Sequence, residues 1–218
     1  KLENITLTSE NKFAPAPECE PDPKIKIFKK ATAQTHLALG FYGLKRDHRD
    51  KHIYSLLHII LGGNMSSRLF SEVREKRGLA YEIGTRVKGF TDTGLFLIHA
   101  GVDNAKLYQA ADVIINELGK IKTRLVLSSE LRRAKEFYIG QLRLALEETL
   151  EHMFWIGEPT LHLDKTYSFS SILKEIKAIT PGDLRRVARQ VFHKRAARMA
   201  IIGPSKEEAK LYASIRKL

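Results

Sequence analysis

The spacing of apolar residues changes twice between residues 47 and 102, and this change restricts the fold more than any other feature of the sequence. Apolar side chains recur at helical intervals up to Leu61, and Gly62 and Gly63 end that run at a point where a left-handed backbone is easiest. Residues 79–90 then alternate between apolar and polar, and a Thr-Asp-Thr-Gly turn leads to a hairpin partner. The sequence therefore predicts a helix, a glycine turn, a second helix and an antiparallel hairpin.

The rest of the chain also divides into strand-like and helix-like runs. The short helix after the glycines is expected to begin at a cap, Ser66 or Ser67, and to end at Gly78. We predict strands at 25–29, 35–44, 95–102 and 198–202. We predict helices from Asn104 to 118, at 168–179, at 180–192 and in the tail. A longer helix is predicted to start at Ser128 or Ser129 and to continue until Gly157 and Pro159 interrupt it. The predicted class is α+β, an antiparallel sheet with helices packed mainly on one face.

Residues 1–24 differ in composition from the chain that follows. Pro15, Pro17, Pro21 and Pro23 stand among small and acidic residues and cannot sustain a helix or an internal strand. We therefore expect a proline-rich linker or strand remnant at 1–24. Residues 25–218 are expected to form one domain, because that length can bury a substantial core.

Charge and composition exclude several classes of protein. The chain holds 37 Lys and Arg against 25 Asp and Glu, a net charge of +12, and 43% hydrophobic residues. This is ordinary globular composition and excludes disorder, collagen and coiled coil. No apolar run approaches the ~18 residues of a membrane span, and Cys19, the single cysteine, cannot form an internal disulfide. We expect a reducing, cytoplasmic compartment and no membrane partner.

No motif in the sequence forms a self-contained active site. His48 and His52 stand four apart, as zinc ligands on a helix do. Lys51 occupies the position of the general-base Glu in the inverted zinc motif, so a solvated helical turn is preferred to a metal site. The sequence contains no GxSxG, GxxxxGK[ST] or GxGxxG motif, and Cys19 lies among the prolines, where it is poorly oriented for catalysis.

The most unusual stretch runs from Leu61 to Tyr81. Its double glycine lets the backbone approach a ligand or a neighbour closely, and Arg74 and Tyr81 flank one tight turn, so that both could reach one site. Two plainer explanations remain open. Arg74 could simply complement the C-terminus of its helix. Tyr81 could pack with Leu79 and Ile83 on the strand face that the alternation assigns to the core.

This stretch also carries a family resemblance. LGGNMSSRLFSEVREKRGLAY and the DTGLF hairpin resemble the second homologous domain of the inverted-motif zinc metallopeptidases related to pitrilysin, insulysin and the mitochondrial processing peptidase. SSELRRAKEFYIGQL, TPGDLRRVARQVF and MAIIGP follow in the order and at the intervals of that family. The resemblance implies a half domain of the LuxS and processing-peptidase kind, two of which enclose a chamber. The zinc motif HxxEH belongs to the first domain, and this sequence contains none.

The resemblance also implies roles for single residues. In the second domain of the family, an Arg and a Tyr seven positions apart reach the substrate backbone and the developing oxyanion beside zinc. Arg74 and Tyr81 have that spacing, and we adopt this role for Tyr81 over the core position that the alternation assigns. The weaker candidates, for a cleft loop, are Gly62, Gly63, Ser66 and Ser67.

The leading hypothesis is therefore a substrate-clamping half of a zinc endopeptidase that acts on peptides or unfolded segments. Such a chain binds no cofactor itself; its expected partners are the peptide substrate and the zinc-binding N-terminal half, in the same polypeptide or in a homologous subunit. One alternative is an inactive scaffold or partner subunit, for which a homodimer is one arrangement. Another is a nucleic-acid-binding module, since residues 179–218 hold ten Lys and Arg against three acids; a solvated basic face is the preferred explanation.

Overall fold

The computed structural model describes residues 14–16, 23–205 and 207–218. Most of the segment predicted as a linker, with Pro17, Cys19 and Pro21, lies outside these residues. Of the part that is described, the backbone N–H of Ala16 donates to Asp92 Oδ2 at 2.6 Å. The first strand begins at residue 24, one residue before the predicted domain boundary.

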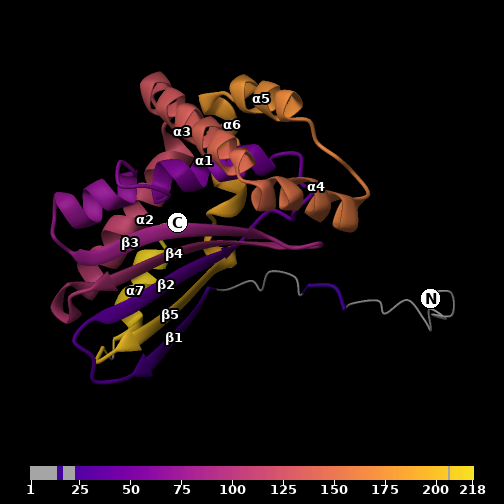
Figure 1. Ribbon diagram of the computed structural model, residues 1–218. Coiled ribbons are helices and arrows are strands. Elements are labelled where there is room, and N and C mark those ends of the chain that lie inside the picture. The colour runs from indigo at the N-terminus through magenta and orange to yellow at the C-terminus, as the bar shows by residue number, and fades with distance from the viewer. Residues whose placement is uncertain (1–13, 17–22, 206) are drawn as a thin grey trace, which may run out of the picture.

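Within the described residues, five strands form one sheet in the order β1-β5-β2-β4-β3 (Figure 1). Their bounds are β1 Lys24–Lys29, β2 Thr35–Tyr42, β3 Ala80–Gly89, β4 Gly94–Val102 and β5 Ala197–Gly203. Neighbouring strands run antiparallel except β1 and β5, which pair in parallel with Lys24 opposite Arg198. The sheet is thus antiparallel through its centre and parallel only at the edge where the first strand meets the last.

The helices gather on one side of this sheet, as Figure 1 shows. Their bounds are α1 Lys51–Leu61, α2 Leu107–Thr123, α3 Ser128–Glu147, α4 Thr149–Leu163, α5 Phe169–Ala178, α6 Pro181–Val191 and α7 Glu208–Ile215, with a π-helical segment at Phe70–Glu75 and 3-10 turns at Asn104–Lys106 and Lys194–Ala196. The predicted α+β class, with helices mainly on one face of the sheet, is confirmed.

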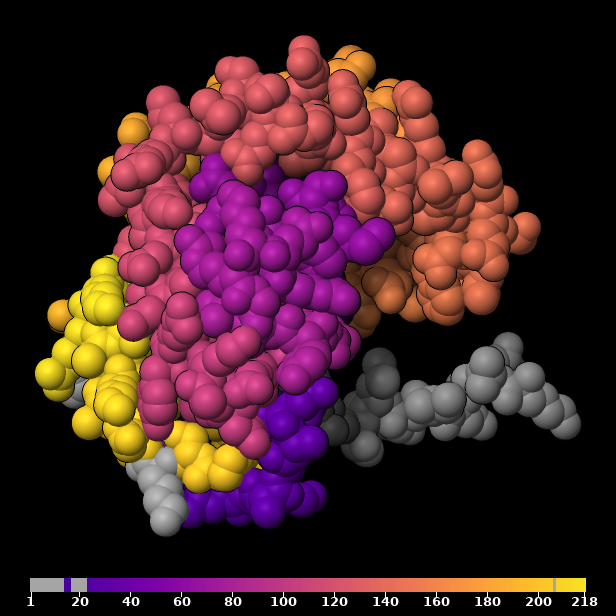
Figure 2. Space-filling view, turned by 90° about the vertical axis from the view of Figure 1, so that its left-hand side faces the viewer, coloured from indigo at the N-terminus to yellow at the C-terminus, as the bar shows by residue number. Residues whose placement is uncertain are grey.

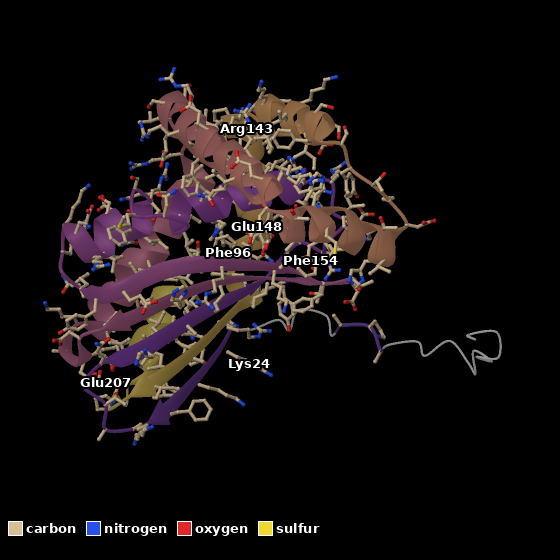
Figure 3. The ribbon with its side chains drawn as sticks, viewed as in Figure 1. Lys24, Phe96, Arg143, Glu148, Phe154 and Glu207 are labelled. Atoms are coloured by element: carbon tan, nitrogen blue, oxygen red, sulfur yellow. The ribbon has the colours of Figure 1, made fainter. Side chains whose placement is uncertain are left out.

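The core lies between the sheet and the helices. Leu37, Leu39 and Phe41 alternate along β2 and are buried. Phe41 and Phe96, which Figure 3 labels on β4, each pack edge-to-face against Phe192 after α6, with ring centroids 5.3 and 4.9 Å apart. Burying such a side chain contributes about 1.5–3 kcal/mol, and the edge-to-face geometry adds to it. The aromatic cluster therefore joins the sheet to the helix layer.

Two helix starts lie where the sequence places them. Thr180 and Asp183 form a capping box before α6: Thr180 Oγ1 accepts from the backbone N–H of Asp183 at 3.2 Å, and Asp183 Oδ2 accepts from that of Thr180 at 3.0 Å. Pro181 occupies the first turn, where its missing N–H does no harm. Ser168 caps α5 by accepting from the N–H of Ser171 at 3.2 Å. These local signals were sufficient because each cap is made within four residues.

The prediction that Asn104 caps α2 is wrong, because α2 begins after Lys106 and has no side-chain cap. Asp103 is the cap of the short 3-10 turn that precedes α2, and its Oδ1 accepts from the N–H of Ala105 at 2.8 Å. Asn104 instead accepts from the Thr35 hydroxyl at 2.7 Å and donates to the carbonyl of Thr32 at 2.9 Å. The Asn104 side chain, which the sequence predicts as a cap, thus binds residues near the start of β2, far away in sequence.

The long helix predicted from Ser128 is also interrupted elsewhere. Extended backbone at Glu148 (φ −87°, ψ 126°) separates α3 from α4, at the position that Figure 3 labels. Gly157 and Pro159 lie inside α4, although the proline removes one helical hydrogen bond. The helix ends at Asp164, whose backbone is left-handed (φ 51°).

Most side chains of helix α4 are exposed, and Figure 2 shows this region, in orange, projecting from the body. It has no buried residue, and the large apolar side chains that are 46–85% exposed on it are Leu150, Met153, Phe154, Ile156 and Leu161. Phe154 and Trp155 line a cavity of about 850 Å³ that Val87 of β3 lines from the other side. The helix therefore overhangs the end of β3 and is not packed into the core.

Candidate functional site

A wide turn of helix carries the first predicted site residue. In the segment Phe70–Glu75 the backbone N–H of Lys76 donates to the carbonyl of Ser71, five residues back, at 2.9 Å. This π-helical spacing is rare and recurs at functional sites. Leu69 and Val73 are fully buried and fix the segment to the core. Arg74, between these anchors and the end of the turn, is exposed.

Gly78 ends the turn, as predicted, and its backbone is left-handed (φ +56°). Its N–H donates to the carbonyl of Arg74 at 3.0 Å, and the N–H of Leu79 donates to that of Val73 at 2.9 Å. These two hydrogen bonds satisfy the last backbone carbonyls of the segment. It turns the chain directly into β3, so that Arg74 and Tyr81 stand on the two sides of one short connection.

The charges of this turn are divided unequally. Glu72 accepts from Lys76 Nζ at 2.6 Å and also pairs with Arg77, and these two cations lower the pKa of Glu72 to about 2. Within the part of the chain that the structure describes, Arg74 forms no ion pair with a carboxylate. Its guanidinium lies over the ring of Phe70, 4.9 Å from the ring centroid. The N–H donors of Arg74 thus remain available to a ligand.

Tyr81 is displaced from the regular strand. Ala80 pairs with Val102 and Glu82 pairs with Gly101, so Tyr81 is an extra residue in β3, a β-bulge. The simple alternation places its side chain in the core, and that prediction is wrong: Tyr81 is 59% exposed. The bulge resets the register, so a period-2 pattern cannot assign the face of this residue.

The glycine turn after α1 is held against β3. The carbonyl of Gly62 accepts from the backbone N–H of Thr85 at 3.2 Å, and a Cβ on Gly62 would lie 2.6 Å from Thr85 Cγ2. The backbone of Gly62 is extended (φ −162°), so the expectation of a left-handed residue is wrong. Close approach, not handedness, requires the glycine. The turn therefore fixes the position of β3 four residues after Tyr81.

Sequence analysis missed Thr85 and His58, the two side chains that complete this junction. The Thr85 hydroxyl donates to the carbonyl of His58 at 3.1 Å and lies 2.7 Å from His58 Nδ1. Burial lowers the pKa of His58, which favours the neutral ring in this position. The apolar run around His58 is typical of a core imidazole that has a protein partner, but nothing in the sequence identifies Thr85 as that partner.

Ser66 and Ser67 do not cap a helix. The N–H of Ser66 donates to Asn64 Oδ1 at 2.8 Å, and Ser67 Oγ is buried with no hydrogen-bond partner in the described structure. Both serines line a cavity of about 410 Å³ whose other walls include Glu117 and Lys120 of α2. Neither Arg74 nor Tyr81 lines this cavity, although Ser71 and Glu72 of the same turn do.

The histidines at the start of α1 have protein partners. His48 Nδ1 accepts from the backbone N–H of Asp50 at 3.0 Å, and His52 Nδ1 lies 3.1 Å from the Tyr138 hydroxyl. Burial and, secondarily, the charge of Lys51 lower the pKa of His52 to about 4. Within the described residues, no three His, Cys, Asp or Glu side chains are grouped so as to hold a metal ion.

Comparison with known proteins identifies the family. A family model described as the peptidase M16 inactive domain matches residues 2–138. The chain belongs to the peptidase M16 inactive-domain family. Relatives of this inactive domain include two proteins named as uncharacterized zinc proteases: one of Streptomyces coelicolor, 36% identical over 185 residues, and one of Bacillus subtilis, 37% identical over 177 residues.

These matches cover 85% and 81% of this chain but only 40% and 43% of the relatives. The chain thus spans less than half the length of the curated relatives it matches. The zinc in their names does not fit the donor groups of this M16 inactive domain, because the described histidines are scattered or engaged with protein partners.

Solved structures share the fold of this M16 inactive domain. A conserved protein from Enterococcus faecalis superimposes with a TM-score of 0.80 at 19% identity, over 91% of this chain and 46% of that one. A peptidase M16 inactive domain from Pseudomonas fluorescens gives 0.76 at 23% identity, over 89% and 47%. At such identities the likeness establishes the fold alone. In addition, none of the described helices is long and apolar enough to cross a bilayer.

Proposed function

We propose that this chain is the zinc-free, substrate-binding half of a zinc metalloendopeptidase that hydrolyses peptides or unfolded segments. Membership of the M16 inactive-domain family and the names of its bacterial relatives support this proposal. The zinc-binding half, in the same polypeptide or in a homologous subunit, is the proposed partner. We also propose that residues 25–218 form the domain and that residues 1–24 are the linker that precedes it.

The proposed chemistry rests on Arg74 and Tyr81. The other half, when it holds zinc, supplies a Lewis acid that polarises the scissile carbonyl. Arg74 offers a planar fork of donors with a permanent charge and is assigned to the carbonyl oxygens of the peptide backbone. The Tyr81 hydroxyl is assigned to the oxyanion that develops on the scissile carbonyl, where a positioned donor acts most strongly once water is excluded.

The observation that carries this proposal is the β-bulge at Tyr81. A tyrosine that served only the core would follow the alternation and be buried, yet the extra residue in β3 leaves this side chain 59% exposed. Bulges recur next to active sites because they redirect a side chain.

The test uses a peptide substrate and the protein that contains both this chain and the zinc-binding half, called here the two-half protein. Tyr81→Phe should lower kcat and kcat/KM together by roughly 100-fold, because the lost donor acts only in the transition state. Arg74→Ala should lower kcat/KM to a similar extent. Arg132→Ala, on the exposed side of α3, and Tyr212→Phe, on α7, are the matched controls and should leave the rate unchanged.

Three outcomes would contradict the proposal. Zinc-dependent hydrolysis by the 218-residue chain alone would show that it is not the zinc-free half. Full activity of both site variants would remove Arg74 and Tyr81 from the site. If the two-half protein cleaves no peptide at all, the scaffold or partner-subunit alternative replaces it.

The nucleic-acid alternative has less support, because several cations of the basic C-terminal region are used within the fold. Arg186 binds Asp50 through both Nη atoms, at 2.7 and 2.9 Å. Lys210 pairs with Glu207 at 2.6 Å, and Lys217 pairs with Asp112 at 2.8 Å. Paired cations contribute less to phosphate binding than free ones. A gel shift at low salt that shows a complex would restore this alternative.

A further inference from the structure

The guanidinium of Arg74 is positioned by an aromatic ring and not by an acid. Phe70 stands one helical turn before Arg74, and the guanidinium carbon lies 4.9 Å from the centroid of the Phe70 ring. This distance is within the range in which a cation is attracted by the negative face of an aromatic ring. We propose that Phe70 is a positioning residue for Arg74, an inference that rests on the proposed function.

The chemistry of the contact explains why an aromatic residue suits this position. A carboxylate partner would occupy the N–H donors of Arg74 and neutralise its charge, which are the two properties that a peptide carbonyl or oxyanion needs. An aromatic face attracts the cation through the flat side of the guanidinium and leaves its edge, where the N–H groups lie, free to donate. The contact can therefore hold the Arg74 side chain in place while its N–H donors and its charge remain available to the substrate.

The neighbouring acid is withheld from Arg74 by the shape of the turn. Glu72 lies two residues before Arg74 and could compete for it, but it pairs with Lys76 four residues on and with Arg77 five residues on. The pairing across five residues suits a π-helical turn, in which the side chains of residues five apart come together. Both carboxylate oxygens of Glu72 thus pair with the two cations outside the proposed site, Lys76 and Arg77, and Glu72 forms no ion pair with Arg74.

The ring itself is held in place. Phe70 is half-buried, and the fully buried side chains of Leu69 and Val73 anchor the same segment to the core. The ring is therefore a fixed surface against which the long Arg74 side chain can rest. Fixing a rotamer-rich side chain before the substrate arrives lowers the entropy lost on binding.

The experiment is a double-mutant cycle in the two-half protein, with kcat/KM for a peptide as the readout. Phe70→Leu keeps an apolar side chain but removes the ring, and should lower kcat/KM about 2–5-fold, the range of an exposed cation–π contact. Phe70→Trp, with a stronger aromatic face, should retain the wild-type value. In an Arg74→Ala background, Phe70→Leu should cause no further loss, because the side chain that it positions is gone.

Phe90→Leu is the matched control. Phe90 forms a similar contact with Lys88, 5.2 Å from Nζ to the ring centroid, at the far end of β3. This variant should leave kcat/KM unchanged. Urea unfolding of each variant reports any loss of stability, which should be smaller for Phe70→Leu in the Arg74→Ala background, because the contact between the ring and the guanidinium is already absent there.

The outcomes separate the two proposals. If Arg74→Ala itself leaves kcat/KM unchanged, the proposed role of Arg74 fails and the inference fails with it. If Arg74→Ala lowers the rate but Phe70→Leu lowers it equally in both backgrounds, Phe70 acts through the fold and the positioning role is overturned. A loss of rate in Phe70→Trp as large as that in Phe70→Leu would likewise overturn it.

Discussion

Gly62 and Gly157 lie in two regions of the molecule that differ in how closely the surrounding atoms pack around the glycine. Gly62 ends α1 against β3, where an added Cβ would lie 2.6 Å from Thr85 Cγ2. Gly157 lies within α4, where an added Cβ would have no neighbour within 4 Å. The first region is fixed by close backbone contacts and carries the proposed site. The second is a projecting helix whose own apolar side chains remain exposed.

The largest difference between the two regions should appear when a leucine is truncated in each. Leu57 of α1 is fully buried, and Leu57→Ala should lower the free energy of unfolding by about 2–5 kcal/mol, through lost burial and the cavity left behind. Leu161 of α4 is 85% exposed, and Leu161→Ala should change it by less than about 0.5 kcal/mol. Urea unfolding monitored by circular dichroism measures both. A loss above 1 kcal/mol for Leu161→Ala would mean that α4 is packed after all.

Substitution of the two glycines gives the next largest contrast. Gly62→Ala should lower the free energy of unfolding by about 1–3 kcal/mol, since Thr85 N and Cγ2 must move away from the new methyl group. Gly157→Ala should raise it by up to about 1 kcal/mol, because alanine favours the helix and nothing opposes its Cβ. Thermal unfolding of the two variants, compared with wild type, should therefore shift in opposite directions. Equal shifts would contradict the contrast.

The smallest expected effect is a pH dependence confined to the packed region. His52 has a pKa of about 4 when folded, below its ordinary value of 6.5, because burial disfavours the charged ring. Between these values the unfolded chain binds a proton that the folded chain does not, so stability falls as pH falls from about 6.5 to 4.

We expect the free energy of unfolding to fall by about 1–2 kcal/mol across this pH range. The full pKa shift of His52 would give a larger loss, but the Glu175 carboxylate, 3.5 Å from Nε2, favours the protonated ring. His52→Gln should flatten the dependence of the unfolding free energy on pH across this window. His152→Gln, on the exposed α4, is the control and should leave the slope as in wild type. An unchanged slope in His52→Gln would assign the acid sensitivity to other groups.

The sequence predicts those parts of the structure that are made locally. The helix that ends at Gly62, the hairpin of β3 and β4, and the helix that starts after Thr180 depend on residues close together in the chain, and all three are present. Asn104 shows the limit of such reasoning, because its side chain is taken by Thr35, 69 residues away. The parallel pairing of β1 with β5 also leaves no local trace.

The same division applies to the proposed site. The spacing of Arg74 and Tyr81 is visible in the sequence, but the bulge that exposes Tyr81 is set by how β3 pairs with β4. The contact of Phe70 with Arg74 had a detectable signal, an aromatic residue and a cation four apart on a helical turn. The cavity that Ser66 and Ser67 line had no such signal, because its other wall is formed by α2, which is distant in sequence.

The parallel pairing at the sheet edge has a consequence for synthesis on the ribosome. Lys24 of β1 pairs with Arg198 of β5, and α7 packs against the same strand. At ordinary translation rates the first strand emerges roughly 10–35 s before its partner is made. During that interval the edge of β1 is an unpaired template to which a neighbouring nascent chain could add. The lysines at positions 24, 26, 29 and 30 place like charges along and just after β1. Their mutual repulsion opposes pairing between the β1 segments of two nascent chains.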